Sequence, residues 1–233
     1  MIAFANTFAN ISIFSVLLPI FFFFLKKRKV DKTVIVLFIF LIASFGSDAI
    51  NEIYVRTGHK GLIIYNIFLV IQFILLSYLF SIFLKKKGKI FFLGIVSFIL
   101  FFIVRIVFFE NINIFQGYAF AFSAFILHLY SWYLFIHLNR ISVIQEKYQT
   151  DHNYHTAILW LNSGINIYFG FNLFTFIVSN YVFTKMSSED GIIFWLFHNI
   201  INVIKNILFA IGIYYAGRKE KPQERIKLSY DLD

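Results

Sequence analysis

The chain has 233 residues, of which 60% are hydrophobic, 21% aromatic and only 14% charged. A water-soluble domain carries about a quarter charged residues, so this composition excludes an ordinary soluble protein and indicates one embedded in lipid. Cysteine is absent, which excludes disulfides, thiolate metal sites and cysteine nucleophiles.

The formal net charge of +9 comes from cations in short runs beside apolar segments, at 26–32, 85–89, 140–147 and 218–227. Basic proteins often bind nucleic acid, but runs in this position are typical of the cytoplasmic face of a membrane. We therefore expect the lipid bilayer as a partner of this chain, and no nucleic acid.

Seven apolar segments follow one another along the chain, at 3–25, 33–55, 61–84, 90–109, 112–138, 156–183 and 191–216. Each is long enough to cross the ~30 Å hydrocarbon core as a helix. The sequence therefore predicts an all-α fold, a polytopic transmembrane bundle of seven spans in one domain at 1–216. Six or eight spans stay open, because the fourth segment is short and the fifth begins indistinctly.

The connecting segments predict the orientation. Residues 1–10 carry no Lys or Arg, and the first basic run follows the first apolar segment, which excludes a signal peptide and favours an outside N-terminus. Sixteen Lys and Arg residues then fall on the cytoplasmic side, including the polar loop at 139–155, and three fall outside. We expect a cytoplasmic, disordered tail at 217–233. The abundance of Phe, Ile, Asn, Lys and Tyr, typical of AT-rich coding, indicates a bacterial inner (cytoplasmic) membrane.

Four charged residues fall inside the predicted spans, namely Asp48, Glu52, Arg105 and Lys205. A charge in hydrocarbon costs at least ~3 kcal/mol and normally faces a partner inside the bundle. Side chains lean toward the start of their own helix, so Asp48 and Lys205 lean toward one level from helices of opposite direction. We predict an ion pair between them and a second pair between Glu52 and Arg105. Snorkelling to the interface is the alternative for that second pair.

Polar residues recur at helical spacing in several spans. The longest stripe lies on the seventh segment and includes Asn199 and Phe209. Shorter stripes on other segments include Ser44, Asn66, His128, Ser131, Asn162, Asn166 and Tyr168. We predict an outward-opening polar pocket whose site residues are Asp48, Asn51, Glu52, Gln72, Arg105, Trp195, His198, Asn202, Lys205 and Asn206. The alternative is that these residues only hydrogen-bond one helix to another.

Enzymatic and metal sites find little support. A metal site needs three or more ligands, and only His128 and His198 lie within spans, while His152 and His155 lie in the polar loop. Ser163 and His198 provide the residue types of a serine nucleophile, but no Gly-x-Ser-x-Gly segment accompanies them. We therefore assign no catalytic residue, no metal ligand and no cofactor.

Two resemblances bear on function. Seven-helix membrane hydrolases of the ceramidase and adiponectin-receptor type carry a pair of histidines on the last helix. This chain has His198 but Asn202 four residues later, so it departs from that motif. In having a lysine, Lys205, in its seventh segment, the chain resembles the microbial rhodopsins, and this resemblance implies retinal bound to that lysine. The rhodopsins have a carboxylate counterion in the third segment, where this chain has Gln72. The Pro-Gln motifs of seven-helix sugar transporters are absent.

The leading hypothesis is a receptor-like sensor or partner subunit, with no appended effector domain, that relays to another membrane protein. The alternative is a transporter of small solutes or ions. An intramembrane enzyme and a retinal-binding protein are the less favoured alternatives.

Overall fold

The computed structural model describes residues 2–25, 32–57, 62–84, 88–109, 111–145, 152–185 and 188–217. Every secondary-structure element in these ranges is an α-helix. In chain order they are α1 (Ile2–Ser15), α2 (Leu17–Phe24), α3 (Lys32–Arg56), α4 (Leu62–Phe83), α5 (Gly88–Phe108), α6 (Gly117–Gln145), α7 (His152–Lys185) and α8 (Ser188–Gly217). The predicted tail beyond residue 217 and the basic run at 26–31 lie outside the described residues.

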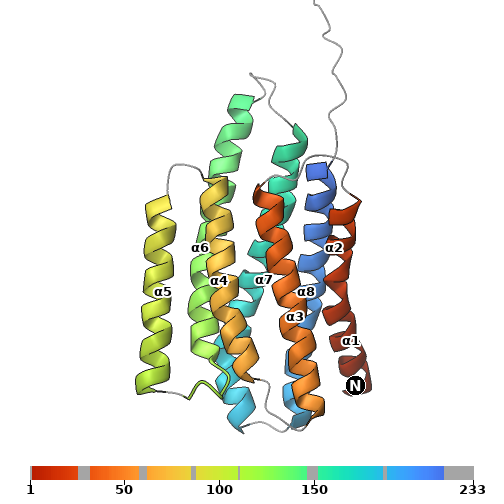
Figure 1. The fold of residues 1–233 in the computed structure, drawn as a ribbon, viewed down its shortest axis with the longest axis vertical. Coiled ribbons are helices and arrows are strands. Elements are labelled where there is room, and N and C mark those ends of the chain that lie inside the picture. Colours follow the sequence, from red (N-terminus) through yellow and green to blue (C-terminus); the bar gives the residue numbers. More distant parts are fainter. Residues whose placement is uncertain are drawn as a thin grey trace, which may run out of the picture.

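Within the described ranges, seven helices are long and apolar enough to cross a membrane, with α1 and α2 together forming the first. The helices alternate in direction, so α1 begins at one end of the bundle and α8 finishes at the other (Figure 1). We call the end where α1 begins the N-terminal end. Large apolar side chains such as Phe92, Phe108 and Phe174 face outward, as a surface in contact with lipid requires. The chain is a multi-pass membrane protein.

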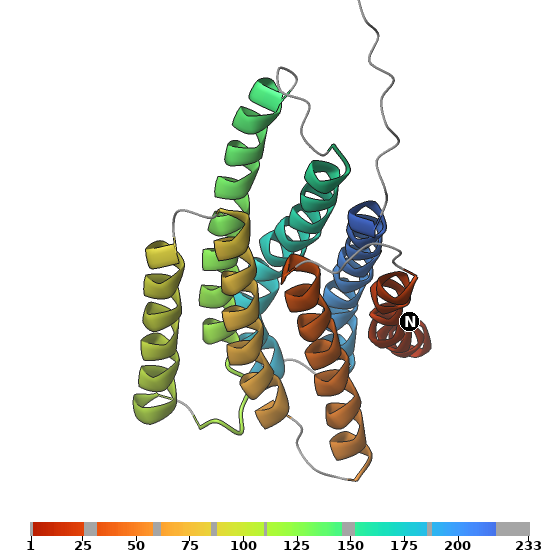
Figure 2. The same cartoon turned by 45° about the horizontal axis from the view of Figure 1, so that its top comes forward.

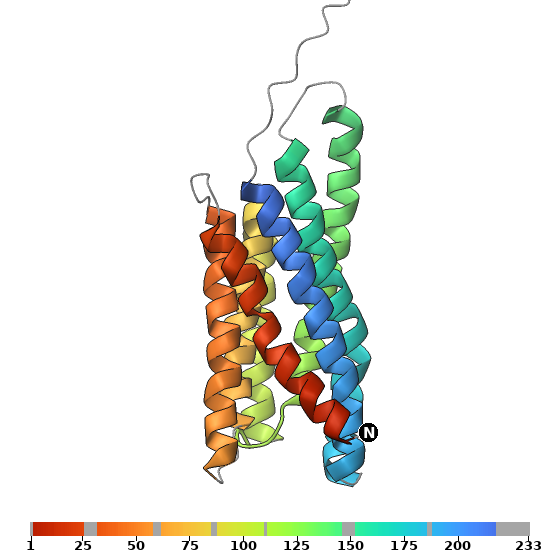
Figure 3. The same cartoon turned by 90° about the vertical axis from the view of Figure 1, so that its right-hand side faces the viewer.

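The order of the helices decides which residues can meet. Helix α7 packs between α6 and α8, α3 packs against α4, and α5 contacts α4 and α6 at the edge of the bundle. That peripheral place of α5 is visible in Figures 1 and 2. Helices α1 and α2 run obliquely against α8 and also touch α3 (Figure 3). Helix α4 therefore stands between α3 and α5.

The hydrogen-bonded helix of the first span is interrupted at Val16, between α1 and α2, although the backbone dihedrals of Val16 stay in the helical range. Proline lacks a backbone N–H and its ring clashes with the carbonyl four residues earlier, which for Pro19 is the carbonyl of Ser15. The Ser15 hydroxyl donates a hydrogen bond of 2.6 Å to the Ser12 carbonyl. This side chain therefore supports the turn just before the break.

The predicted boundaries differ from the helices in two places. Apolar residues at 112–116 belong to the connection before α6, where Asn66 Nδ2 donates to the carbonyls of Ile112 and Ile114 at 2.7 Å each. A buried side chain thus holds an apolar stretch outside a helix. The expected polar loop at 139–155 is helical at 139–145 and 152–155, because helix formation needs no apolar side chains and both helices continue past the hydrophobic window.

Helices α7 and α8 approach closely where glycines face the partner helix. A Cβ atom on Gly212 would lie 2.7 Å from Leu161 Cγ and 3.1 Å from the Ala157 carbonyl oxygen, whereas one on Gly46 would meet no atom within 4 Å. Gly212→Ala is expected to destabilise the protein by about 1–3 kcal/mol through overpacking. Thermal unfolding in detergent measures this effect, and Gly46→Ala is the matched control. Equal melting temperatures for the two variants would contradict the close approach.

Candidate functional site

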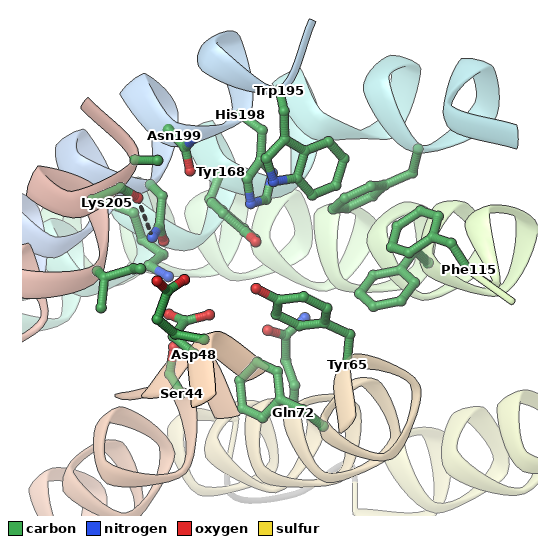
Figure 4. A pocket seen from close by; sticks show the side chains of 18 residues that line it. Ser44, Asp48, Tyr65, Gln72, Phe115, Tyr168, Trp195, His198, Asn199 and Lys205 are labelled. Atoms are coloured by element: carbon green, nitrogen blue, oxygen red, sulfur yellow. Dashed lines mark hydrogen bonds between the residues drawn. The ribbon is translucent and has the colours of Figure 1, made fainter. Parts of the chain in front are cut away.

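A cavity of about 190 Å³ lies among α1, α3, α4, α6, α7 and α8 (Figure 4). It lies toward the N-terminal end of the bundle, because its residues come from Ser44 onward in α3 and from Trp195 to Lys205 in α8, which begins at that end. It is lined by Ala9, Ser12, Ile13, Ser44, Asp48, Glu52, Tyr65, Phe68, Gln72, Phe115, Phe120, Tyr168, Phe176, Trp195, His198, Asn199, Asn202 and Lys205. Charged, polar and aromatic side chains thus share one intramembrane space.

The polar stripe of α8 supplies one wall of this cavity. Residues three and four apart lie on one face of a helix, and that spacing brings Trp195, His198, Asn202 and Lys205 to the lining together. On the opposite side, Ser44, Asp48 and Glu52 follow one another at intervals of four along α3, with Gln72 beside them on α4. Asp48, Glu52, Gln72, Trp195, His198, Asn202 and Lys205 are therefore brought together by the fold.

Asp48 and Lys205 face each other across the cavity from α3 and α8 (Figure 4). Their charges interact electrostatically, although within the described residues no salt bridge of 4.0 Å or less joins them. Lys205 is only 3% exposed. A buried ammonium of this kind needs an opposite charge close by, and the Asp48 carboxylate is in the position to supply it.

Aromatic rings complete the surroundings of Lys205. Its Nζ lies 4.4 Å from the centre of the Tyr168 ring, 5.6 Å from that of Phe40 and 6.0 Å from that of Phe209. A cation over the face of an aromatic ring is attracted by the ring's negative face. The cavity thus already holds one cation, attached to the chain itself, at its deep end.

His198 is fixed by a hydrogen-bond relay within α7 and α8. Asn172 Nδ2 donates to the Tyr168 carbonyl at 2.9 Å, which leaves Asn172 Oδ1 to accept a bond of 2.9 Å from His198 Nδ1. The His198 ring also stacks on Trp195, with centroids 4.5 Å apart. In an uncharged imidazole, a donating Nδ1 leaves Nε2 as a hydrogen-bond acceptor.

Helix α1 is hydrogen-bonded to α8 by two serine–asparagine pairs one turn apart. Asn202 Nδ2 donates to Ser12 Oγ at 2.9 Å, and Asn206 Nδ2 donates to Ser15 Oγ at 2.7 Å. The first pair lines the cavity and the second stands next to the break at Val16. The predicted site residue Asn206 therefore belongs to this helix contact and does not line the cavity.

Two further predicted site residues lie elsewhere. Asn51 Nδ2 donates to the Tyr65 hydroxyl at 3.1 Å and so positions a lining residue. Arg105 lies on α5, with its guanidinium over the rings of Phe109 and Tyr118 at 5.4 and 4.9 Å. Since α4 stands between α3 and α5, the structure does not bring Arg105 to the cavity beside Glu52.

Several polar residues of the shorter stripes join helices. Asn162 Nδ2 donates to the Ser131 carbonyl at 3.0 Å, and Ser131 Oγ donates to the Asn162 carbonyl at 3.3 Å. Asn66 holds the connection before α6, and His128 Nε2 accepts from Trp132 at 2.9 Å. The Asn162–Ser131 pair is a helix-to-helix contact of the kind that membrane bundles commonly use, whereas the His128–Trp132 bond lies within α6.

The cavity ends at a layer of large apolar side chains. On the side of Lys205 away from the N-terminal end, the rings of Phe40 and Phe209 are in contact, with centroids 6.2 Å apart. These two side chains are 2% and 0% exposed. Further along the same helices toward the opposite end of the bundle, Leu37 and Ile213 are also fully buried. These buried apolar side chains lie between the cavity and the opposite end of the bundle.

The sequence did not single out the contributions of other helices. Ser12, Tyr65, Phe115, Phe120 and Phe176 line the cavity without having been predicted. Ser12 and Ser15 are three residues apart, and Asn202 and Asn206 are four apart. Each pair therefore recurs after about one helical turn, a signal that comparing the two helices would have found. The chain has 34 phenylalanines, so an individual lining ring carries no comparable signal.

The chemistry available in the cavity is that of charges, aromatic faces and hydrogen bonds. Within the described ranges, no group of three His, Asp or Glu side chains gathers as a metal site would require. The imidazole Nε2 of His198 and the carboxylates of Asp48 and Glu52 accept hydrogen bonds, and a small polar molecule fits the volume. No family model, curated protein or solved structure matches the chain.

Proposed function

We propose that this protein is a receptor-like membrane sensor that binds a small molecule in the cavity and relays the event to a membrane protein partner. The carrying observation is that a cavity rich in polar groups stops at the packed layer of Phe40 and Phe209. A sensor needs a site that is accessible from one side. A transporter needs a path that can open to both sides.

The orientation proposed with this function places the cavity on the outer side of a bacterial inner membrane. The N-terminal end is then outside, and the helix ends next to the basic runs are cytoplasmic. This assignment is supported by the sixteen-to-three distribution of Lys and Arg between the two sides.

A route for the relay is supported by the contacts between α1 and α8. A ligand that touches Asn202 would compete with its bond to Ser12, and the neighbouring pair, Asn206 with Ser15, adjoins the break at Val16. Breaks of this kind are common hinge positions. We propose that ligand binding changes the angle between α1 and α2, and that the partner protein senses the cytoplasmic end of α2.

Flux measurements separate the sensor from a transporter. Stopped-flow light scattering on proteoliposomes reports solute entry after osmotic gradients of glycerol, amino acids, sugars and choline. The sensor hypothesis predicts entry rates equal to those of protein-free vesicles for every solute. A rate increase that disappears in an Asn202→Leu variant would overturn it in favour of transport through the cavity.

A solute transporter remains the second candidate, because one observation favours it. Transporters bind their substrates beside discontinuous helices, and the first span is interrupted one turn from Ser12, which lines the cavity. Under this hypothesis the layer at Phe40 and Phe209 is a closed gate.

The proposed orientation predicts the outcome of a labelling experiment. The chain contains no cysteine, so Lys147→Cys and Lys185→Cys each create a single reactive thiol. A membrane-impermeant reagent added to intact cells is expected to label position 185 and leave position 147 unlabelled until the cells are opened. Labelling at position 147 in intact cells would contradict the proposed orientation.

A further inference from the structure

One wall of the cavity is a closed circuit of rings. Trp195 stacks on His198 at 4.5 Å and meets Phe115 edge-on at 5.7 Å. Phe115 stacks on Phe120 at 4.8 Å, Phe120 lies 5.2 Å from Phe176, and Phe176 returns to His198 at 5.8 Å. Helices α6, α7 and α8 and the connection before α6 thus present a continuous aromatic surface to the cavity.

The facing wall carries the acidic groups. Asp48 and Glu52 line the cavity from successive turns of α3. Tyr65 of α4 lies on the same side of the cavity as Asp48 (Figure 4). Aromatic faces opposite carboxylates are the arrangement that recognises organic cations in proteins. Lys205, held over Tyr168 within the same cavity, demonstrates that these surroundings accommodate an ammonium group.

The charges favour a cation over an anion or a zwitterion. Among the described lining residues, Asp48 and Glu52 are acidic, Lys205 is basic, and His198 provides an imidazole. The two carboxylates outnumber the one ammonium among these residues, and Lys205 interacts with Asp48, so a ligand cation is favoured over a ligand carboxylate. The acceptor Nε2 of His198 adds a site for an N–H donor, which a protonated amine provides and a quaternary ammonium lacks.

We propose that the cavity binds a small protonated amine with an apolar body, the N–H groups toward Asp48, Glu52 and His198 and the body against the aromatic circuit. This inference deepens the proposed sensor function and rests on it. It assigns the class of ligand and makes the aromatic circuit, which includes Trp195, the element that selects the ligand.

Three probes of one shape test the class of ligand on the unaltered protein. These are 2-phenylethylamine, which is cationic at neutral pH, 2-phenylethanol, which is neutral, and 3-phenylpropanoate, which is anionic. Calorimetric titration of the protein in nanodiscs of neutral lipid is expected to show the amine binding at least about tenfold tighter than the alcohol, as expected for a charge in a low-dielectric site. The carboxylate is expected not to bind.

Variants locate the site. Glu52→Gln is expected to weaken amine binding about tenfold and leave alcohol binding unchanged, since it removes only a charge. Trp195→Leu is expected to weaken both. Trp132→Leu is the matched control, because Trp132 is 54% exposed on α6, and amine binding in this variant should equal that of the unaltered protein.

The outcomes distinguish this inference from the proposed function. Equal binding of amine and alcohol, tighter binding of the carboxylate, or no binding of any probe at millimolar concentration would each overturn the amine site. None of these results bears on whether solutes cross the membrane. Solute entry into proteoliposomes, in turn, would overturn the sensor and leave a measured amine preference intact.

Discussion

Replacing Lys205 with methionine is expected to destabilise the protein by roughly 3–5 kcal/mol, the range found when one member of a buried charge pair is removed. Lys205 is 3% exposed and faces Asp48 across the cavity. Methionine fills the same volume, so the effect reports the lost ammonium. The remaining carboxylate then stands in a low-dielectric cavity without the cation opposite. Thermal and denaturant unfolding in detergent measure the change.

The double variant provides the control for this prediction. With Asp48→Asn added, no charge is left stranded, so the double variant should lose clearly less stability than the sum of the two single losses. A positive interaction energy of about 1–3 kcal/mol from this cycle is expected for groups that act on each other. Strict additivity would show that Asp48 and Lys205 are energetically independent.

The second large effect is expected for Asn66→Leu, which lies outside the cavity. Asn66 is fully buried, donates to two carbonyls at 2.7 Å and accepts from the Gln116 backbone N–H at 3.3 Å. Leucine makes none of these bonds. Each buried backbone group left unpaired costs about 1–3 kcal/mol, so we expect a loss of about 3 kcal/mol or more and a faster exchange of the backbone amides at 111–116.

A matched asparagine in the same connection serves as the control. Asn113 is exposed, and Asn113→Ala should leave the free energy of unfolding within about 0.5 kcal/mol of that of the unaltered protein, as is usual for surface positions. If Asn66→Leu also behaved in this way, the connection before α6 would not depend on the buried amide.

The fold was predictable from sequence to the extent that hydropathy determines it. The seven apolar segments are confirmed as helices, and each helix is long and apolar enough to cross a bilayer. Hydropathy does not distinguish a lipid-facing helix from a buried connection, so the start of α6 was placed five residues early. Hydropathy also does not show where a helix continues beyond the apolar segment. The last residues of α6 and the first residues of α7 were therefore assigned to a loop.

The site was predictable where one helix carries it. Helical periodicity alone placed Trp195, His198, Asn202 and Lys205 on one face of α8, and these residues line the cavity. The order of helices around the bundle is set by tertiary packing, which no periodicity reveals. Arg105 was assigned to the pocket for that reason, although α5 lies at the edge of the bundle.

The central claim is that the cavity opens to the outer side alone, and cysteine accessibility along α8 tests it most directly. Asn199 lines the cavity, Ile213 lies beyond the layer of Phe40 and Phe209, and Phe197 faces outward from the bundle at 46% exposure. Each is replaced singly by cysteine and exposed to a small cationic thiol reagent in intact cells.

Asn199→Cys is expected to react from outside, with Ile213→Cys unreactive from either side and Phe197→Cys reacting slowly, as a lipid-facing thiol does. Reaction of Ile213→Cys from outside would reveal a continuous aqueous path and contradict a one-sided site. An unreactive Asn199→Cys would equally contradict the account, because the cavity would then be closed to the outer solution.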